Sequence, residues 1–259
     1  MLLLLCRVHG HRYDVNHHGD YFYILTNRDG GLNNRLMRTP ITATAQSNWQ
    51  EIRPYSNTQK LDYLQCFRGH MVIQGRAGGV RQIWVVDMEQ FGNDSSVTRY
   101  EHAIDFPEPV YSAGCTDNYE YDTNKVRLWY SSFITPSTIL DYDMADRSRE
   151  IKQTKEVPNY DPSLYESTRI DALARDGTMI PVSLVYRTDA RPTVSGTSQS
   201  LLVWSNSPEF CLIRFSHQVP RPMVLYGYGS YGSCIDPSFD HTRYEPSFPL
   251  AFTKRISHP

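Results

Sequence analysis

Three glycines and two tyrosines between residues 227 and 232 form the part of the sequence best suited to chemistry. Gly227, Gly229 and Gly232 alternate with Tyr228 and Tyr231 directly after an apolar run. Glycine adopts backbone dihedrals that other residues avoid, so the chain can turn sharply here and approach a ligand closely. The tyrosines add phenolic O–H donors. The pattern therefore predicts a buried strand that ends in a ligand-contacting turn.

The same glycine spacing spells G-x-G-x-x-G, the fingerprint of a dinucleotide-binding turn. That fold needs a helix to begin at the third glycine, so that the helix N-terminus faces a pyrophosphate. Here Gly232 is followed by a polar stretch that contains Pro237 and two aspartates, which predicts irregular chain. A nucleotide-binding oxidoreductase is therefore disfavoured, and no cofactor is expected.

The turn offers donors but no recognisable nucleophile. Ser230 would fit a nucleophile elbow, G-x-S-x-G, only if glycine stood in place of Tyr228. No G-x-S-x-G sequence occurs in the 259 residues.

Most of the chain before this turn is β-rich and loosely repetitive. Two apolar strands joined by a turn recur at 21–41, 70–87 and 126–143, and each pair continues into a more polar strand. Leu36, Ile83 and Ile139 occupy equivalent positions, with steps of 47 and 56 residues. A four-stranded unit repeated every ~40–50 residues is typical of a β-propeller blade.

One such sheet cannot bury both of its faces alone, so we expect the units to stack on one another. The sequence predicts about three blades, whereas closed propellers use ~4–8. The chain is therefore expected to hold part of a propeller. A β-sandwich of irregular hairpins is the alternative.

The repeat ends at residues 157–163, where two prolines and several polar residues predict a linker. Asp176 and Gly177 then separate two β-rich runs, which is a strong hairpin signal. We therefore expect a partial β-propeller at 1–160 and a second domain at 161–259.

Composition excludes several classes of partner. The net charge is −2, from 26 basic and 28 acidic residues, so nucleic acid is not an expected partner. The apolar run at 1–6 is too short for a signal peptide, and no run approaches membrane-spanning length. The five cysteines are far apart and form no C-x-x-C motif, which favours a reducing, cytoplasmic compartment.

Four histidines near the start of the chain invite a metal interpretation. They are His9, His11, His17 and His18. The adjacent pair would point to opposite faces of a strand, and no cysteine or carboxylate completes a tetrahedral set. No metal is expected.

Two sequence runs carry a resemblance to a known family. They are Arg-Asp-Gly-Thr-Met-Ile-Pro-Val at 175–182 and Leu-Tyr-Gly-Tyr-Gly-Ser-Tyr-Gly at 225–232. Together with the propeller pattern they resemble the prolyl oligopeptidase family of serine peptidases, and within it the oligopeptidase B group of trypanosomatids. Residues 131–139 and 160–167 are similar to the end of that propeller and the crossing into the next domain. The resemblance weakens over 188–221 and is lost after Tyr244.

The family joins a seven-bladed propeller to an α/β-hydrolase domain. The resemblance therefore implies a mostly β chain: C-terminal propeller blades, then the first strands of an α/β-hydrolase domain, with an atypical tail at 245–259 that is unlike any hydrolase strand or helix. Tyr228 matches the tyrosine that helps to form the oxyanion hole, where an O–H donor stabilises developing charge. Tyr231 matches an aromatic residue of the primary specificity pocket, and Gly227 and Gly229 match the substrate-binding turn.

The resemblance also implies substrates. Oligopeptidase B cleaves short peptides after Arg or Lys, so these are the expected partners of the full-length family. The family's catalytic serine, aspartate and histidine lie beyond the point that corresponds to Pro259. We therefore expect a truncated fragment that does not hydrolyse peptides by itself. The alternative is a non-catalytic propeller module that binds a peptide or a protein, or associates through an open blade edge.

Overall fold

The regular secondary structure of the described residues is almost entirely β-strand, and the chain is grouped into two compact units. The computed structural model describes residues 8–173, 176–190, 200–204, 212–213, 224–228, 234–243 and 250–255. The first unit comprises Met1–Asp105, Ala113–Trp129 and Ile139–Gln153, and the second comprises Phe106–Ser112, Tyr130–Thr138 and Thr154–Pro259.

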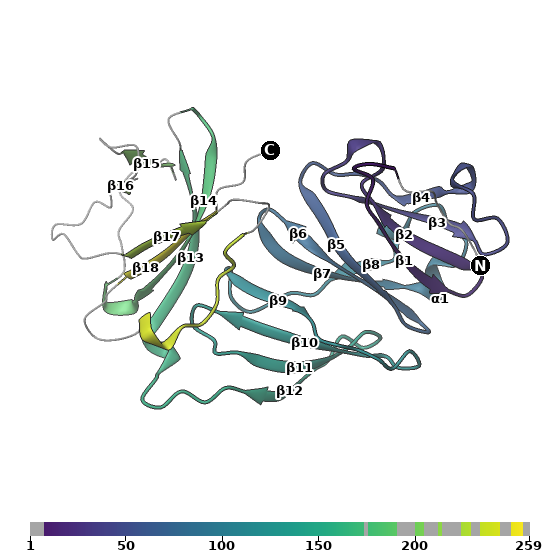
Figure 1. The fold of residues 1–259 in the computed structure, drawn as a ribbon. Coiled ribbons are helices and arrows are strands. Elements are labelled where there is room, and N and C mark those ends of the chain that lie inside the picture. The colour runs from purple at the N-terminus through teal and green to yellow at the C-terminus, as the bar shows by residue number, and fades with distance from the viewer. Residues whose placement is uncertain are drawn as a thin grey trace. The chain divides into compact units, whose positions relative to one another are not determined.

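Three four-stranded sheets follow one another along the chain (Figure 1). The first contains β1 (Tyr13–His18), β2 (Tyr21–Thr26), β3 (Arg35–Pro40) and β4 (Gln50–Arg53). The second contains β5 (Gln59–Cys66), β6 (His70–Ala77), β7 (Val80–Asp87) and β8 (Glu101–Ala103). The third contains β9 (Tyr111–Cys115), β10 (Lys125–Ser132), β11 (Thr138–Asp143) and β12 (Arg149–Thr154). In every sheet neighbouring strands are consecutive in sequence, so the predicted four-stranded repeat and the mostly β fold are confirmed.

Helices are short and serve as connections. The α-helix α1 spans Met88–Phe91, and the Asp87 side chain caps it by accepting hydrogen bonds from two backbone N–H groups. Short 3-10 turns span Arg28–Gly30, Gln46–Asn48, Val97–Arg99, Pro162–Leu164, Thr188–Ala190 and His241–Arg243.

Glycine forms the tight turns that the sequence predicts. Gly78 and Gly79, between β6 and β7, have φ values of 54° and 85°. Gly177 has a φ of 86° in the turn between β13 (Tyr165–Leu173) and β14 (Met179–Arg187). Because non-glycine residues rarely adopt positive φ, these positions fix where each hairpin reverses.

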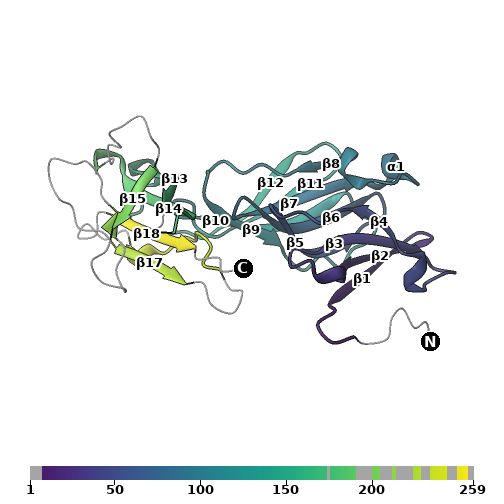
Figure 2. The ribbon, with the colours of Figure 1, turned by 90° about the horizontal axis from the view of Figure 1, so that it is seen from above.

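The first two sheets, drawn in purple and blue in Figure 2, share one apolar core. Successive side chains of β2 point to opposite faces. Tyr23 and Leu25 therefore pack with the second sheet, whereas Ile24 packs with Met37 and Trp49 on the opposite face. The members of the shared core from β5 to β7 are Leu61, Leu64, Cys66, Met71, Ile73, Trp84 and Val86.

A buried ion pair crosses the same seam. Arg53 Nη1 of β4 lies 2.9 Å from Glu101 Oε2 of β8, and the two side chains are 4% and 13% exposed. The Arg53 guanidinium also lies over the ring of Trp84, 4.5 Å from its centroid. Burial lowers the pKa of Arg53 and raises the pKa of Glu101, while each charge opposes the shift of the other.

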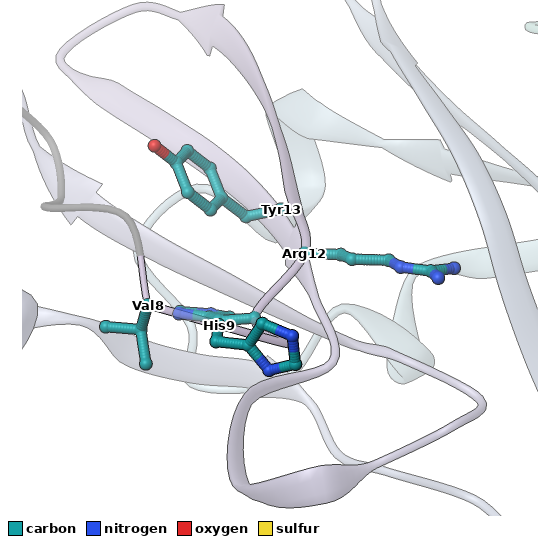
Figure 3. A pocket seen from close by; sticks show the side chains of 5 residues that line it. Val8, His9, Arg12 and Tyr13 are labelled. Atoms are coloured by element: carbon teal, nitrogen blue, oxygen red, sulfur yellow. The ribbon is translucent and has the colours of Figure 1, made fainter.

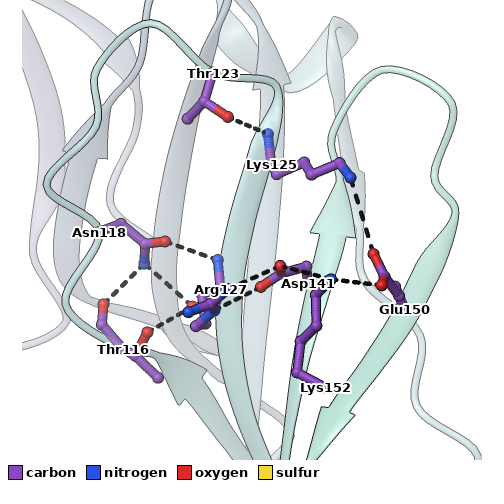
Figure 4. A network of polar contacts seen from close by, with 8 residues as sticks. All are labelled: Thr116, Asn118, Thr123, Lys125, Arg127, Asp141, Glu150 and Lys152. Atoms are coloured by element: carbon purple, nitrogen blue, oxygen red, sulfur yellow. Dashed lines mark hydrogen bonds and ion pairs between the residues drawn. The ribbon is translucent and has the colours of Figure 1, made fainter.

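The third sheet carries a ladder of charges (Figure 4). Arg127 of β10 makes two hydrogen bonds to Asp141 of β11, at 2.7 and 3.0 Å. Lys152 of β12 lies 3.7 Å from Asp141 and 2.5 Å from Glu150. All six residues of β12 are exposed. Charged side chains on such an outer strand disfavour pairing with another chain.

The second unit contains a six-stranded mixed sheet in the order β16-β15-β13-β14-β18-β17. Its further strands are β15 (Ser200–Trp204), β16 (Leu212–Ile213), β17 (Val224–Tyr228) and β18 (Leu250–Arg255). β13 and β14 are antiparallel, as are β14 and β18, whereas β17 runs parallel to β18.

The strand β18 lies in the tail at 245–259, for which the sequence predicted no element. We expected this tail to be unlike any hydrolase strand or helix; within it, Leu250–Arg255 pair with both β14 and β17. A short apolar run next to prolines has no decisive periodicity of its own. Its pairing partners, which lie far away in sequence, determine its conformation.

A prediction concerns the buried ion pair. Glu101→Gln leaves the Arg53 charge buried without a carboxylate, so the free energy of unfolding should fall by about 3 kcal/mol. Glu51→Gln is the matched control, because Glu51 forms a more exposed ion pair with Arg35, also at 2.9 Å; its loss should cost less than about 1 kcal/mol. Urea titrations followed by circular dichroism compare the two. Equal losses of unfolding free energy in the two variants would contradict the stabilising role of the buried Arg53–Glu101 ion pair.

A second prediction concerns pH. His102 Nε2 of β8 lies 2.9 Å from the hydroxyl of Tyr142 in β11. Burial is the main cause that lowers the pKa of His102, followed by the nearby Arg147 and His70. The folded chain therefore binds a proton at His102 more weakly than the unfolded chain, whose histidines titrate near about 6.5. The associated stability is present above that pH and is lost as the pH falls below it.

The measurement is the free energy of unfolding at pH 7.5 and at pH 5.5. The wild-type chain should be less stable at pH 5.5, and His102→Gln should reduce that difference. A residual difference is expected because burial also lowers the pKa of His70. His17→Gln, at an exposed position, is the control and should behave as wild type. A pH dependence that His102→Gln leaves unchanged would refute the prediction.

Candidate functional site

Tyr228 is the last residue of β17, at the carboxyl end of a parallel pair of strands. Tyr228 is paired in register with Arg255 of β18, and Gly227 with Lys254. Parallel strands end at the same edge of a sheet, and open sheets bind ligands outside the carboxyl ends of such strands. The backbone therefore brings the predicted donor to a position that suits ligand contact.

Of the other predicted site residues, the structure describes only Gly227. Gly227 is exposed within β17. Gly229 and Tyr231 lie outside the described residues, so their roles stay predictions from the sequence.

The described chain resumes at Cys234 and is anchored at Phe239. The backbone N–H of Phe239 donates a hydrogen bond to Ser131 Oγ over 3.1 Å. Its ring meets the ring of Tyr160 edge-on, with centroids 4.8 Å apart. Ser131 is 108 residues earlier in the chain and lies near the end of β10. The segment after the glycine-rich turn is therefore held by residues that precede the six-stranded sheet in sequence.

Ser131 belongs to a tight turn, residues 131–135, which we call the 131–135 turn. Ser132 is fully buried, and its Oγ accepts hydrogen bonds from the backbone N–H groups of Ile134 and Thr135, at 2.9 and 2.7 Å. The same hydroxyl donates to Glu108 Oε1 over 3.0 Å. The Thr135 hydroxyl donates to that oxygen as well. One carboxylate oxygen therefore fixes both hydroxyls of the turn.

Tyr160 connects this turn to the six-stranded sheet. Its hydroxyl donates to the carbonyl oxygen of Ile134 over 2.7 Å. Its ring stacks on Tyr165, the first residue of β13, at a centroid distance of 5.6 Å. Burial is the main cause that raises the pKa of Tyr160, with further contributions from neighbouring acidic groups. The hydroxyl is therefore a neutral, permanent donor at physiological pH.

An apolar cluster lies beside these polar contacts. Val110, Phe133 and Val185 are at most 4% exposed and pack together, with Ile134 and Tyr165 against them. Phe133 follows β10, while Val185 belongs to β14. Both polar and apolar contacts of the 131–135 turn therefore join the third sheet to the six-stranded sheet within the second unit.

Sequence reasoning did not identify these anchoring residues. The stretch at 157–163 was recognised as a break in the repeat, and it contains Tyr160. The partners of Ser131 and Tyr160 lie 108 and 26 residues away in sequence. No local pattern signals contacts at such separations; a serine three residues before a threonine is only a weak sign of a side-chain-closed turn.

A surface pocket near the start of the chain offers no comparable chemistry. Val8, His9, His11, Arg12 and Tyr13 line it. His11 Nε2 is 2.8 Å from Thr26 Oγ1. In Figure 3 the Arg12 side chain points away from Val8, His9 and Tyr13. Across the described part of the chain, no group of three or more potential ligands is arranged to hold a metal.

Nor does any helix within the described ranges have the length and apolar character that a bilayer crossing requires.

Comparison with known proteins gives consistent matches. Residues 1–155 match the family described as prolyl oligopeptidase, N-terminal beta-propeller domain. "Protease 2" of Moraxella lacunata is 31% identical over 232 residues, which cover 89% of this chain and 28% of that protein. "Dipeptidyl aminopeptidase BI" of Pseudoxanthomonas mexicana is 31% identical over 233 residues, covering 89% and 27%.

Solved structures show the same relationship. Oligopeptidase B from Trypanosoma brucei, with covalently bound antipain, matches with a TM-score of 0.76 and 28% identity, over 97% of this chain and 32% of that chain. Oligopeptidase B from Leishmania major matches with a TM-score of 0.75 and 28% identity, over 95% and 32%. The chain therefore spans less than a third of the length of each of these relatives.

The contacts of Glu108 yield a prediction. Glu108→Ala removes the acceptor of two hydroxyls, so the free energy of unfolding should fall by about 2 kcal/mol. Glu108→Gln keeps an oxygen that can accept both hydrogen bonds. The amide nitrogen of the glutamine replaces Oε2, which is buried without a hydrogen-bond partner. That variant should stay within about 1 kcal/mol of wild type. Urea titration of both variants is the measurement. If the glutamine variant loses as much as the alanine variant, the acceptor role of Oε1 is wrong.

Proposed function

Because this chain belongs to the prolyl oligopeptidase family of serine peptidases, we propose that it carries the oxyanion-binding part of an oligopeptidase B-like site. The observation that carries this proposal is the position of Tyr228. It ends a strand of a parallel pair, in a chain whose residues 1–155 match the family's propeller domain.

In the proposed division of the chain, residues 1–160 form propeller blades and residues 161–259 form the first part of an α/β-hydrolase domain. The order of the strands supports this division. β18 lies between β14 and β17, although it follows β17 in sequence. The chain therefore crosses over after the glycine-rich turn and returns parallel to β17, as in doubly wound sheets.

The proposed chemistry is stabilisation of an oxyanion. When a nucleophile attacks a peptide carbonyl, negative charge develops on its oxygen, and a preorganised O–H donor lowers the energy of that state. Tyr228 would supply this donor. Gly227 and Gly229 would let the backbone approach the substrate, and Tyr231 would line the pocket for the residue before the scissile bond.

The proposed substrates are short peptides cleaved after Arg or Lys, by analogy with oligopeptidase B. The proposed compartment is the cytoplasm, and no cofactor is required for this type of acyl transfer. In support of a reducing compartment, Cys66, Cys115 and Cys234 are free thiols in the described part of the chain.

The absence of a G-x-S-x-G motif from the 259 residues favours a second candidate, a non-catalytic module. In that case the same turn would bind a peptide without cleaving it. Oxyanion donors and binding groups alone give only residual catalysis in serine peptidases that lack their triad. Both candidates therefore predict that this chain binds peptide.

The test separates binding from hydrolysis. The purified chain should neither hydrolyse esters of arginine nor react with a fluorophosphonate. It should bind a short peptide that ends in arginine, because the terminal carboxylate can accept a hydrogen bond from Tyr228. Tyr228→Phe should weaken that binding about tenfold. Tyr119→Phe is the control, since Tyr119 is 90% exposed and belongs to the other unit.

Isothermal titration measures the affinities. Fluorophosphonate labelling would contradict the proposed inactivity. Equal affinities of the wild-type and Tyr228→Phe chains would contradict the role of Tyr228.

A further inference from the structure

We propose that His70 and His102 form a pH-sensitive latch between the second and third sheets, closed while both rings are neutral and opened when they bind protons. We call this pair the histidine latch. Its opening separates the third sheet locally, while the first two sheets stay stacked. The inference does not depend on the role proposed for Tyr228. Both histidines and their neighbours in the third sheet belong to the first unit.

The first step is that both histidines lie on the same face of the second sheet. Side chains alternate between faces along a strand, and residues paired across two strands share a face. Trp84 of β7 belongs to the core shared with the first sheet. Val85 points the other way and pairs in register with His102. Asp87 points the same way as Val85 and pairs with His70. The histidines therefore lie on the face turned away from the first sheet.

The second step is that the third sheet meets this face through polar groups. Gln74 of β6 lies four residues after His70, so its side chain is on the same face. Its Oε1 accepts a hydrogen bond from the backbone N–H of Cys115, at the end of β9, over 2.8 Å. His102 Nε2 lies 2.9 Å from the hydroxyl of Tyr142, which is 2% exposed. One of these two contacts therefore contains a group that titrates between pH 5 and 8.

The third step is that proton binding alters the contact of His102. A neutral imidazole can accept the hydrogen bond from the Tyr142 hydroxyl at Nε2. An imidazolium carries an N–H donor on both nitrogens and accepts nothing. The Tyr142 O–H then loses this acceptor in a buried position, which is unfavourable while the two sheets remain in contact.

The fourth step is that His70 is poorly placed to hold a second proton. It is 8% exposed, and within the described structure its Nδ1 is buried without a hydrogen-bond partner. A protonated ring would therefore place charge on a buried N–H group that lacks an acceptor. Burial is the largest effect on His70 and lowers its pKa, although the nearby carboxylates of Asp87, Asp143 and Glu89 act in the opposite direction.

The fifth step is that like charges meet across the seam. Burial is the largest cause that lowers the pKa of His102, followed by the charges of Arg147 and His70, while Asp105 opposes them. Arg147 belongs to the turn between β11 and β12 of the third sheet. Tyr142 is also close to Arg149 and Asp146. Two protonated histidines thus face an arginine on the opposite side of the seam.

These effects fix the direction of the pH dependence. The closed seam binds protons at the histidine latch more weakly than an open seam, in which the rings reach water and titrate near about 6.5. The stabilising effect of the neutral rings is therefore fully present above that pH. It is lost as the pH falls below it, because the open state then binds more protons than the closed one.

The seam between the first two sheets should not open in the same way. Its buried carboxylate, Glu101, has a raised pKa, chiefly through burial, so the folded chain binds a proton there more strongly than the unfolded chain. Acidification therefore does not weaken this seam through Glu101. His18 Nε2, which lies 2.8 Å from the carbonyl oxygen of Arg68, can donate to it in either protonation state.

The experiment measures hydrogen exchange of single amides in the whole chain at pH 7.5 and pH 5.5. Each rate is expressed as a protection factor, relative to the unstructured chain at the same pH. The Cys115 amide reports on the seam with the third sheet, because it donates to Gln74. The Leu61 amide is the matched control, because it donates across the other seam to the carbonyl of Asn33. From pH 7.5 to 5.5, protection of Cys115 should fall about tenfold and that of Leu61 less than about twofold.

Variants assign this response to the histidine latch. His70→Gln/His102→Gln should show the same protection of Cys115 at both pH values. His9→Gln/His17→Gln removes two histidines at exposed positions and should keep the wild-type response. Tyr142→Phe removes the O–H group that loses its acceptor, so its response should shrink to about threefold.

Equal falls in protection at Cys115 and Leu61 in the wild type would overturn the proposal, because the whole unit would then open together. Unchanged protection of Cys115 would overturn it too, as would a tenfold response that persists in His70→Gln/His102→Gln. If that double variant does not fold, Tyr142→Phe decides: a reduced response supports the histidine latch, and a full response refutes it.

Discussion

Apolar side chains on both faces of the first sheet impose the constraint on which the arrangement of the strands depends. Leu25 and Leu36 belong to the core shared with the second sheet, while Ile24 and Met37 are buried on the opposite face. Each such side chain contributes about 1.5–3 kcal/mol when it is removed from water. A four-stranded sheet cannot supply this burial by itself. Stacking on a neighbour is therefore part of folding for each sheet of this kind, and polar groups at the seam must be paired.

The buried arginines show how this pairing is achieved. Arg53 has a carboxylate partner at the seam between the first two sheets. Arg38, which is 3% exposed, instead donates to the backbone carbonyls of Gly92 and Asn93, just after α1. Carbonyls at a helix end carry partial negative charge and so favour a cation. Both arginine side chains thus reach from the first sheet to partners in or next to the second sheet. The seam between the two sheets therefore contains defined polar contacts as well as apolar ones.

Local signals allowed much of this fold to be predicted from sequence, and long-range contacts explain the rest. The glycine turn at 77–79 and the Asp176-Gly177 turn were predicted because positive φ is a property of single residues. β18 was not predicted, because its two partner strands, rather than its own short run, determine it. For the site, the sequence indicated Tyr228 by glycine spacing and resemblance. Ser131 lies in a stretch that carries the resemblance, but the sequence assigned no role to it or to Glu108, since their roles arise from contacts with residues far away in the chain.

The third sheet is divided between the two compact units within its own strands. Residues 106–112 and 130–138 group with the six-stranded sheet, although β9, β10 and β11 continue into the first unit. The contacts of the 131–135 turn account for this grouping. Glu108 accepts hydrogen bonds from the hydroxyls of Ser132 and Thr135, and Phe133 packs with Val185 of β14. A domain boundary drawn along the sequence alone would therefore separate residues whose contacts depend on one another.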